Sequence, residues 1–214
     1  MIEVDPTQRE ARAREVRHDV VATLIGGTHL TFRGVFAAQW LIAAALAWKS
    51  SLPGESRLMF TMILGAMLSV PALLFARAAP QAHWVRHFMA ACQMGWSILF
   101  MWLLEGQPEA QLHVFVSLAF LAFYRDWRVI VTASLIAMAW PFAKLAMVPA
   151  NYVIGPSAWW RVFNQVAWVV ADAVVMLIAV LQSLKSITKF SGHAATLSLT
   201  GAPSKPQEVA SRAA

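Results

Sequence analysis

The sequence is poor in charge and almost without cysteine. Only 13% of its 214 residues are charged, against about 25% in an average soluble domain. This shortage excludes a disordered chain, a nucleic-acid-binding domain and an ordinary cytosolic enzyme. A single cysteine, Cys92, excludes an internal disulfide and gives no sign of the redox compartment.

Motifs that carry catalysis are missing as well. The sequence has no glycine-rich phosphate loop, no nucleophile elbow, no His-Glu-x-x-His run and no pair of carboxylates spaced for a cleft. We therefore expect no enzyme activity, no catalytic residue and no cofactor.

Apolar residues, in contrast, are abundant. They make up 59% of the chain, with a mean hydropathy of +0.58, which indicates an integral membrane protein. A spanning helix needs roughly 20 mostly apolar residues. Six stretches approach this length, at about 33–50, 58–77, 84–104, 112–125, 128–148 and 159–185. The expected fold is all-α, a polytopic bundle of six transmembrane helices preceded by an amphipathic surface helix.

The basic residues are distributed unevenly between the two ends of these stretches. With six spans, 13 Lys and Arg residues fall on the side of the termini and 4 on the other side. Because cytoplasmic loops carry the excess of positive charge, we expect both termini in the cytoplasm of a bacterium, with the protein in the inner membrane.

The predicted organisation has three parts. Residues 1–30 form a cytoplasmic amphipathic segment, with an N-cap at Asp5, an apolar stripe that includes Val16 and Val20, and an end at Gly26-Gly27. Such a helix either docks a partner or lies on anionic lipid. Residues 31–188 form the transmembrane domain, and residues 189–214 form a polar cytoplasmic tail that should be disordered alone.

Histidine is the residue that haem, pigments and copper in membranes usually need. None of the six histidines is expected at mid-membrane depth. His83 and His87 lie one helical turn apart, but a metal would need two further ligands. We favour headgroup contacts for this pair and predict no metal site.

Asp172 is the one acid expected near the centre of the bilayer. Its predicted neighbours at the same depth are Gln39, Ser69, Gln93 and Ser134. The candidate polar or ligand cluster comprises Glu109, His113, Asp172, Gln93 and Gln39. Hydrogen bonding between helices explains these residues as well as a ligand or proton site does, and we favour hydrogen bonding.

The run from Gln111 to Arg128 reads QLHVFVSLAFLAFYRDWR. It resembles the signature of a bacterial multi-helix (six-TM) membrane input module found ahead of histidine kinase, chemotaxis-receptor and diguanylate cyclase domains. In that family one helix opens with His-x-His-x-Phe and closes with Leu-Ala-x-Tyr-Arg-Asp-Trp-Arg. The resemblance implies a membrane-boundary motif made of Tyr124, Arg125, Asp126, Trp127 and Arg128, in which we expect Arg125 to pair with Asp126.

This chain departs from the family pattern at most of its histidines. Gln111 stands where the first histidine of the signature belongs, whereas Glu109 and His113 are retained. Other family positions that carry histidine or glutamate correspond here to Trp102, Pro141, Asn164 and Gln165. About 29 residues follow the sixth stretch, which leaves no room for an output domain.

These observations favour a non-catalytic accessory subunit of a larger energy-converting membrane complex, built on a degenerate sensor-type fold. A photosynthetic reaction-centre or a respiratory, electron-transport assembly is the expected host. The expected partners are other membrane subunits and lipids, with pigment or quinone packing on the tryptophan-rich surface. Two alternatives remain: a sensory input protein that acts in trans on a signalling partner, and a small transporter.

Overall fold

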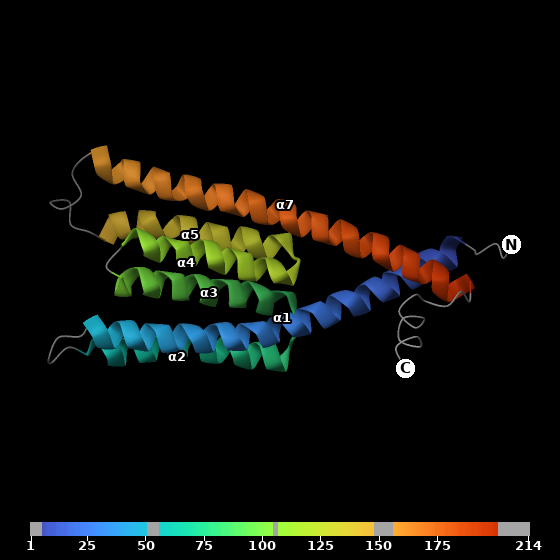
Figure 1. The fold of residues 1–214 in the computed structure, drawn as a ribbon, viewed down its shortest axis with the longest axis horizontal. Helices are drawn as coiled ribbons and strands as arrows, with labels where there is room; N and C mark the ends of the chain where they lie inside the picture. The colour runs from blue at the N-terminus through green and yellow to red at the C-terminus, as the bar shows by residue number, and fades with distance from the viewer. Residues whose placement is uncertain (1–5, 51–55, 105–106, 148–155, 201–214) are drawn as a thin grey trace, which may run out of the picture. The chain divides into compact units, whose positions relative to one another are not determined.

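The computed structural model describes residues 6–50, 56–104, 107–147 and 156–200. They form six α-helices and a short 3₁₀ helix, so the all-α prediction is confirmed (Figure 1). The helices are α1 (Pro6–Ser50), α2 (Arg57–Ala78), α3 (His83–Leu103), α4 (Pro108–Leu121), the 3₁₀ helix η1 (Ala122–Tyr124), α5 (Trp127–Met147) and α7 (Pro156–Thr200).

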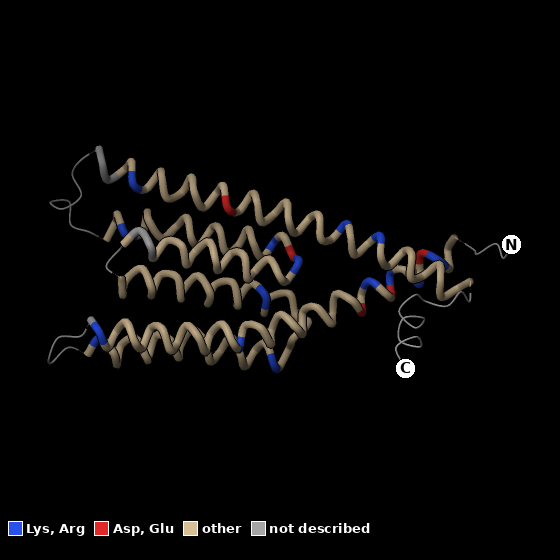
Figure 2. The backbone as a smooth tube through the Cα atoms, in the orientation of Figure 1, with Lys and Arg blue, Asp and Glu red and all other residues tan. Residues whose placement is uncertain are grey.

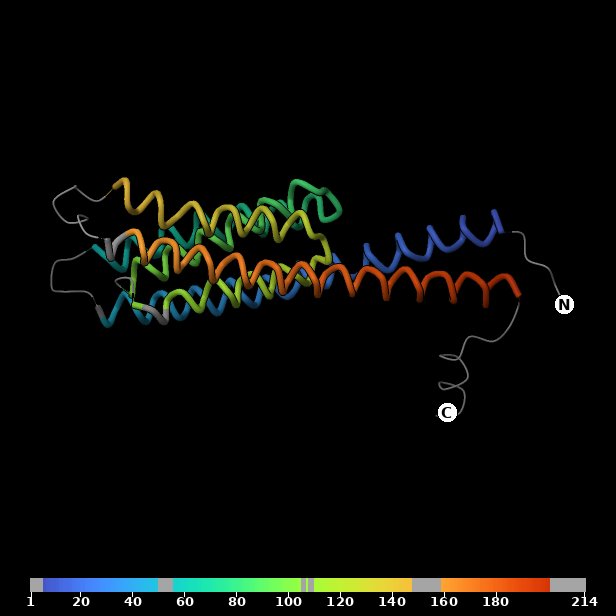
Figure 3. Tube along the Cα trace, turned by 90° about the horizontal axis from the view of Figure 1, so that it is seen from above, coloured from blue at the N-terminus to red at the C-terminus, as the bar shows by residue number. Residues whose placement is uncertain are grey.

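The chain divides into two compact units. The helix-pair unit comprises residues up to Leu24 and from Leu181 onward, and the bundle unit comprises Ile25–Val180. In the bundle unit α3 packs against α2, α4 and α5, and α4 also packs against α5. Figures 1 and 3 show these helices running along a common direction.

Four of the described helices, α1, α2, α5 and α7, are long and apolar enough to cross a membrane, which indicates a multi-pass membrane protein. The expectation of six such helices is therefore not met. At 14 residues, α4 is short. In contrast, α3 has 21 residues but carries polar side chains, including Arg86, Gln93 and Ser97, and 13 of its residues are buried. Because α3 faces other helices more than lipid, its composition reflects that environment.

Apolar side chains cover the outside of the long helices. Met67 of α2 is 66% exposed, Leu135 of α5 is 59% exposed and Trp168 of α7 is 59% exposed. Such a surface suits lipid and would be a liability in water. The interior of the bundle holds large buried side chains, among them Phe32, Trp96 and Leu118. The one cysteine, Cys92, is also buried there.

The predicted end of a surface helix at Gly26-Gly27 is wrong, because α1 continues without a break to Ser50. Glycine weakens a helix by about 1 kcal/mol relative to alanine but does not by itself end one. The next turn is held in place: Thr28 donates to the carbonyl of Phe123 at 3.2 Å, and His29 Nε2 lies 3.0 Å from the carbonyl of Pro80. These contacts fix the helix on the far side of the glycine pair.

The disorder expected for the polar tail that begins at residue 189 is not seen as far as Thr200, where α7 ends. Ile187, Ser191 and Ala195 are buried in the helix-pair unit. Their spacing places them on one face of α7, and the segment of α1 up to Leu24 is the other described segment in this unit. Burial of that face explains why this polar stretch is helical. Residues 201–214 lie outside the described residues.

Candidate functional site

A network of neutral hydrogen bonds centres on His113 of α4, inside the bundle. The Nε2 atom of His113 lies 3.1 Å from Nε2 of Gln39 on α1. Its Nδ1 atom lies 2.9 Å from the hydroxyl of Ser97 on α3 and 3.3 Å from that of Ser117 on α4. His113 therefore joins α1 and α3 to α4.

Gln93 completes this network, which we call the interior cluster: Gln39, Gln93, Ser97, His113 and Ser117. The Gln93 side-chain amide donates to the Ser117 hydroxyl at 2.9 Å, and the Ser97 hydroxyl donates to the backbone carbonyl of Gln93 at 3.3 Å. Gln93 is fully buried. The structure thus brings together three of the five predicted residues, His113, Gln39 and Gln93, and adds two serines that the sequence prediction missed.

The two serines have a recognisable sequence signal. Ser97 follows Gln93 by four residues on α3, and Ser117 follows His113 by four residues on α4. Side chains four residues apart share one face of a helix. A polar pair of this spacing on each of two adjacent apolar helices indicates a shared interface.

Two acceptors of the interior cluster, Oε1 of Gln39 and Oε1 of Gln93, have no hydrogen-bond partner among the described residues. Leaving such a group buried costs about 1–3 kcal/mol unless water satisfies it. Among the described residues the cluster contains one titratable group, His113, and its other members are amides and hydroxyls.

Asp172 lies on α7 and makes no hydrogen bond to the described residues of the interior cluster. Its Oδ2 atom is buried and has no hydrogen-bond partner in the described part of the chain. No hydrogen bond among the described residues joins Asp172 to Ser69 or Ser134: the Ser69 hydroxyl accepts from two tryptophans, and the Ser134 hydroxyl donates to the backbone carbonyl of Ile130 on its own helix. Equal depth along two helices does not make residues neighbours, because rotation about each axis decides which side chains meet.

Placing Asp172 in a membrane-spanning helix costs free energy of insertion. An aspartate at the centre of a transmembrane helix disfavours insertion by about 2.5–3.5 kcal/mol. No hydrogen bond between described residues links it to the interior cluster, so the described chain contains no continuous polar path between them. The side chain of Glu109, the remaining predicted residue, lies outside the described residues.

Ser69 of α2 is a shared acceptor beside the interior cluster. The indole N–H of Trp40 on α1 donates to its hydroxyl at 3.2 Å, and that of Trp96 on α3 donates at 3.0 Å. Gly65, one turn earlier on α2, makes room for both rings: a Cβ atom there would lie 3.0 Å from Cη2 of Trp96 and 3.3 Å from Cε2 of Trp40.

The boundary motif begins with Tyr124 of η1, which is buried. Its hydroxyl lies 3.0 Å from Nδ1 of His29, and its ring stacks on Phe32 with 5.6 Å between centroids. His29 in turn contacts the carbonyl of Pro80. Tyr124 and His29 therefore tie η1, α1 and the connection before α3 together.

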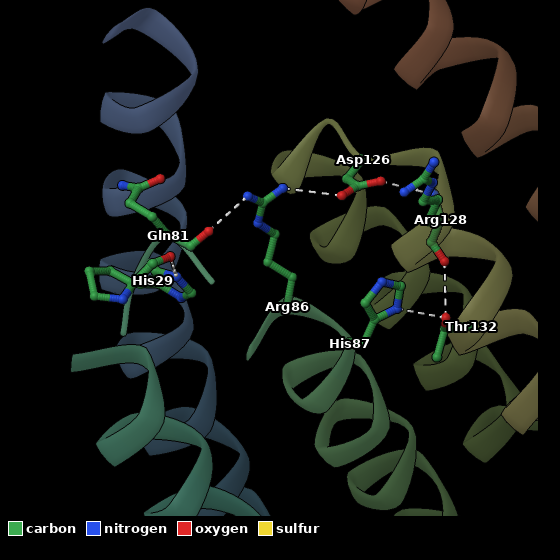
Figure 4. Close-up of polar contacts among 8 residues, drawn as sticks. His29, Gln81, Arg86, His87, Asp126, Arg128 and Thr132 are labelled. Atoms are coloured by element: carbon green, nitrogen blue, oxygen red, sulfur yellow. Dashed lines mark hydrogen bonds and ion pairs between the residues drawn. The ribbon is translucent and has the colours of Figure 1, made fainter. Parts of the chain in front are cut away.

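Asp126 is the centre of the second half of the motif (Figure 4). Its Oδ2 accepts from Nη1 of Arg86 at 3.1 Å, and its Oδ1 accepts from the backbone N–H of Arg128 at 3.1 Å. The second contact makes Asp126 the N-cap of α5. The expected pairing of Arg125 with Asp126 is wrong, because Arg125 adopts a left-handed conformation (φ 51°) at the end of η1, while Asp126 is turned toward α3.

The histidine pair at the start of α3 does not form a metal site with its neighbours. Nδ1 of His87 lies 2.8 Å from the hydroxyl of Thr132 (Figure 4), and His83 is exposed. Within the described ranges no group of three or more His, Cys, Asp and Glu side chains is placed to hold a metal ion.

At the opposite end of α3 a hollow of about 440 Å³ is lined by Ser56, Arg57, Phe60 and Trp102. The Arg57 guanidinium lies 5.0 Å from the Trp102 ring centroid, and the Phe60 ring meets the same indole edge-on at 5.5 Å. Sequence reasoning gave no indication of this hollow.

Comparison with known proteins does not place the chain in a family. No family model matches it, and neither a curated protein nor a solved structure is significantly similar.

Proposed function

We propose that this chain is a non-catalytic, integral-membrane subunit of a larger membrane complex. One observation carries the proposal: the polar side chains inside the bundle bind one another. His113 uses both ring nitrogens on Gln39 and the two serines, so the interior cluster has the form of a structural joint between helices.

The membrane orientation follows from charge. Hydrogen bonds place Thr28, the connection between α2 and α3, and the connection between η1 and α5 at one end of the bundle. Arg77, Arg86, Arg125 and Arg128 belong to that end. We assign it to the cytoplasm of a bacterial inner membrane, with both termini on that side.

The proposed host is an energy-converting assembly, either photosynthetic or respiratory. Exposed tryptophans support this choice, because an indole ring packs well against a flat pigment or quinone. Seven are exposed in the described residues: Trp48, Trp84, Trp102, Trp127, Trp159, Trp160 and Trp168.

Purification through a tag on this chain, from its native membrane in a mild detergent, tests the proposal. Particle mass, subunit identities and the visible absorption spectrum are recorded together. We expect a large particle with stoichiometric pigment- or haem-bearing subunits. A small colourless particle, together with unchanged membrane complexes after deletion of the gene, would refute the accessory role.

A second candidate is a sensory input protein that acts in trans. It is favoured by the continuity of α7, a single helix of 45 residues that belongs to both units and thus joins the bundle to the helix pair. Reconstitution with its signalling partner tests this function. Substituting His113 and Glu109 should change the partner's output, and an unchanged output would end the sensor interpretation.

A further inference from the structure

The membrane part of α7 has three distinct sides. Val162, Val169, Ala173 and Val180 are buried, and their spacing of seven and four residues places them on one face. This covered face is the side by which α7 packs on the bundle. The other positions lie on either side of it.

The two sides of α7 that flank the covered face differ in polarity. One, the apolar edge, presents Phe163, Val170 and Val174, which are 58%, 45% and 49% exposed. The other, which we call the polar edge, carries Arg161, Gln165, Trp168 and Asp172. Steps of four, three and four residues align these four side chains along one line of the helix.

Lipid alone does not account for the polar edge. Asp172 is the one charged residue between Arg161 and Lys185 (Figure 2). It lies about 16 Å further along the helix than Arg161, at 1.5 Å per residue, which is too deep for a lipid headgroup to reach. Acids at such depth face protein and pair with another group.

The described bundle does not supply that group. Asp172 is partly exposed, and its Oδ2 atom has no hydrogen bond among the described residues. Among the described side chains, Gln165 Nε2 is hydrogen-bonded to the thioether sulfur of Met101 alone, at 3.9 Å, and this sulfur is a weak acceptor. The Trp168 ring is 59% exposed. The polar edge is therefore unsatisfied at the side of α7 that the bundle leaves open.

We propose that the polar edge of α7 docks a transmembrane helix of a different polypeptide, which carries an arginine, lysine or histidine at the depth of Asp172. Charge complementarity selects this occupant, because a donor opposite the carboxyl group satisfies it inside the membrane. The inference rests on the proposed function, since it names the surface through which the subunit joins its complex.

A second copy of this chain is a poor occupant. Two copies in one membrane share the same orientation, so a two-fold contact along this edge would set like residues against each other at equal depth. Asp172 would face Asp172 and Arg161 would face Arg161. Both pairs repel.

Photo-crosslinking in the native membrane tests the docking surface. Benzoylphenylalanine replaces Trp168 on the polar edge or, as the matched control, Phe163 on the apolar edge, which is 58% exposed against 59%. We expect the probe at position 168 to attach to one other polypeptide, within a turn of a basic residue in a membrane helix. The probe at 163 should attach to lipid. Adducts to a second copy, or equal adducts from both positions, overturn the proposal.

Substitution of the carboxyl group provides the second measurement. Asp172→Leu should reduce the co-purified partner at least about ten-fold per chain, whereas Phe163→Leu should leave it unchanged. The amount of the chain in the membrane and its melting temperature show that each variant folds. Replacing the crosslinked basic residue by leucine together with Asp172→Leu should restore assembly.

The two proposals fail differently. If the unmodified chain purifies without any large particle, the proposed function is wrong. If the large particle persists at full stoichiometry with Asp172→Leu, the function stands and the docking surface is wrong.

Discussion

Arg86 and Asp126 form an ion pair that joins α3 to the start of α5, with 3.1 Å between Nη1 and Oδ2. Their side chains are only 9% and 15% exposed. The same carboxylate caps α5 through the N–H of Arg128. One aspartate thus fixes both the direction of α5 and its contact with α3.

Asp126→Ala should lower the free energy of unfolding by about 3 kcal/mol or more, because it leaves a buried arginine unpaired and removes an N-cap. Asp126→Asn keeps a capping oxygen and should cost less. Titration with SDS in mixed micelles measures both. The exposed Arg128→Ala control should stay within about 1 kcal/mol. Equal losses for the alanine variants of Asp126 and Arg128 would show that the ion pair contributes nothing.

Gly65→Ala should destabilise the bundle by about 1–3 kcal/mol, since the new methyl group meets the rings of Trp96 and Trp40 at 3.0–3.3 Å. A shift in tryptophan fluorescence should accompany the loss. Gly34→Ala is the matched control, because a Cβ there has no atom within 4 Å. The prediction fails if the two variants are equally stable.

Replacing Gly26 and Gly27 by alanine should stabilise α1, by about 1 kcal/mol per site. A Cβ at either position meets nothing within 4 Å. Slower amide hydrogen exchange over residues 22–30 is the readout. A helix that ended at these glycines in a left-handed conformation would respond in the opposite way, so faster exchange would refute the continuous α1.

His113→Leu should lower the free energy of unfolding by about 1–3 kcal/mol, because the Gln39 amide loses its contact with the ring and Ser97 loses one of its hydrogen-bond partners inside the bundle. The buried Ser134→Ala control removes a hydroxyl that bonds within its own helix and should cost less than about 1 kcal/mol. Thermal melting in detergent separates the two. Unaltered stability of the His113 variant would mean that the interior cluster is not a structural joint.

The positions of the helices could be read from the sequence, because apolar runs and the turns between them are local features. Each of the six predicted stretches falls largely within a described helix. The number able to span could not, because burial by neighbours lets α3 be more polar than a lipid-facing helix. The helix end predicted at Gly26-Gly27 failed for a similar reason. Local propensity favours a helix end there, but the contacts of the following turn keep α1 continuous.

The sequence allowed us to predict which residues belong to the candidate site, but not which side chains hydrogen-bond to one another. Gln39, Gln93 and His113 meet, since each is a polar residue on an apolar helix and such residues seek one another. Asp172 does not join them, because hydropathy gives depth without rotation. Arg125 was the natural partner for Asp126 by adjacency, yet an aspartate immediately before a helix is also an N-cap signal, and that signal gave the correct geometry.

The burial of Cys92 gives this chain a practical advantage. With no other thiol in the sequence, the unmodified protein offers water-soluble maleimides almost nothing to label. Cysteines introduced one at a time therefore report their own surroundings without a cysteine-free background. A scan along both ends of the helices would then assign each loop to one side of the membrane directly.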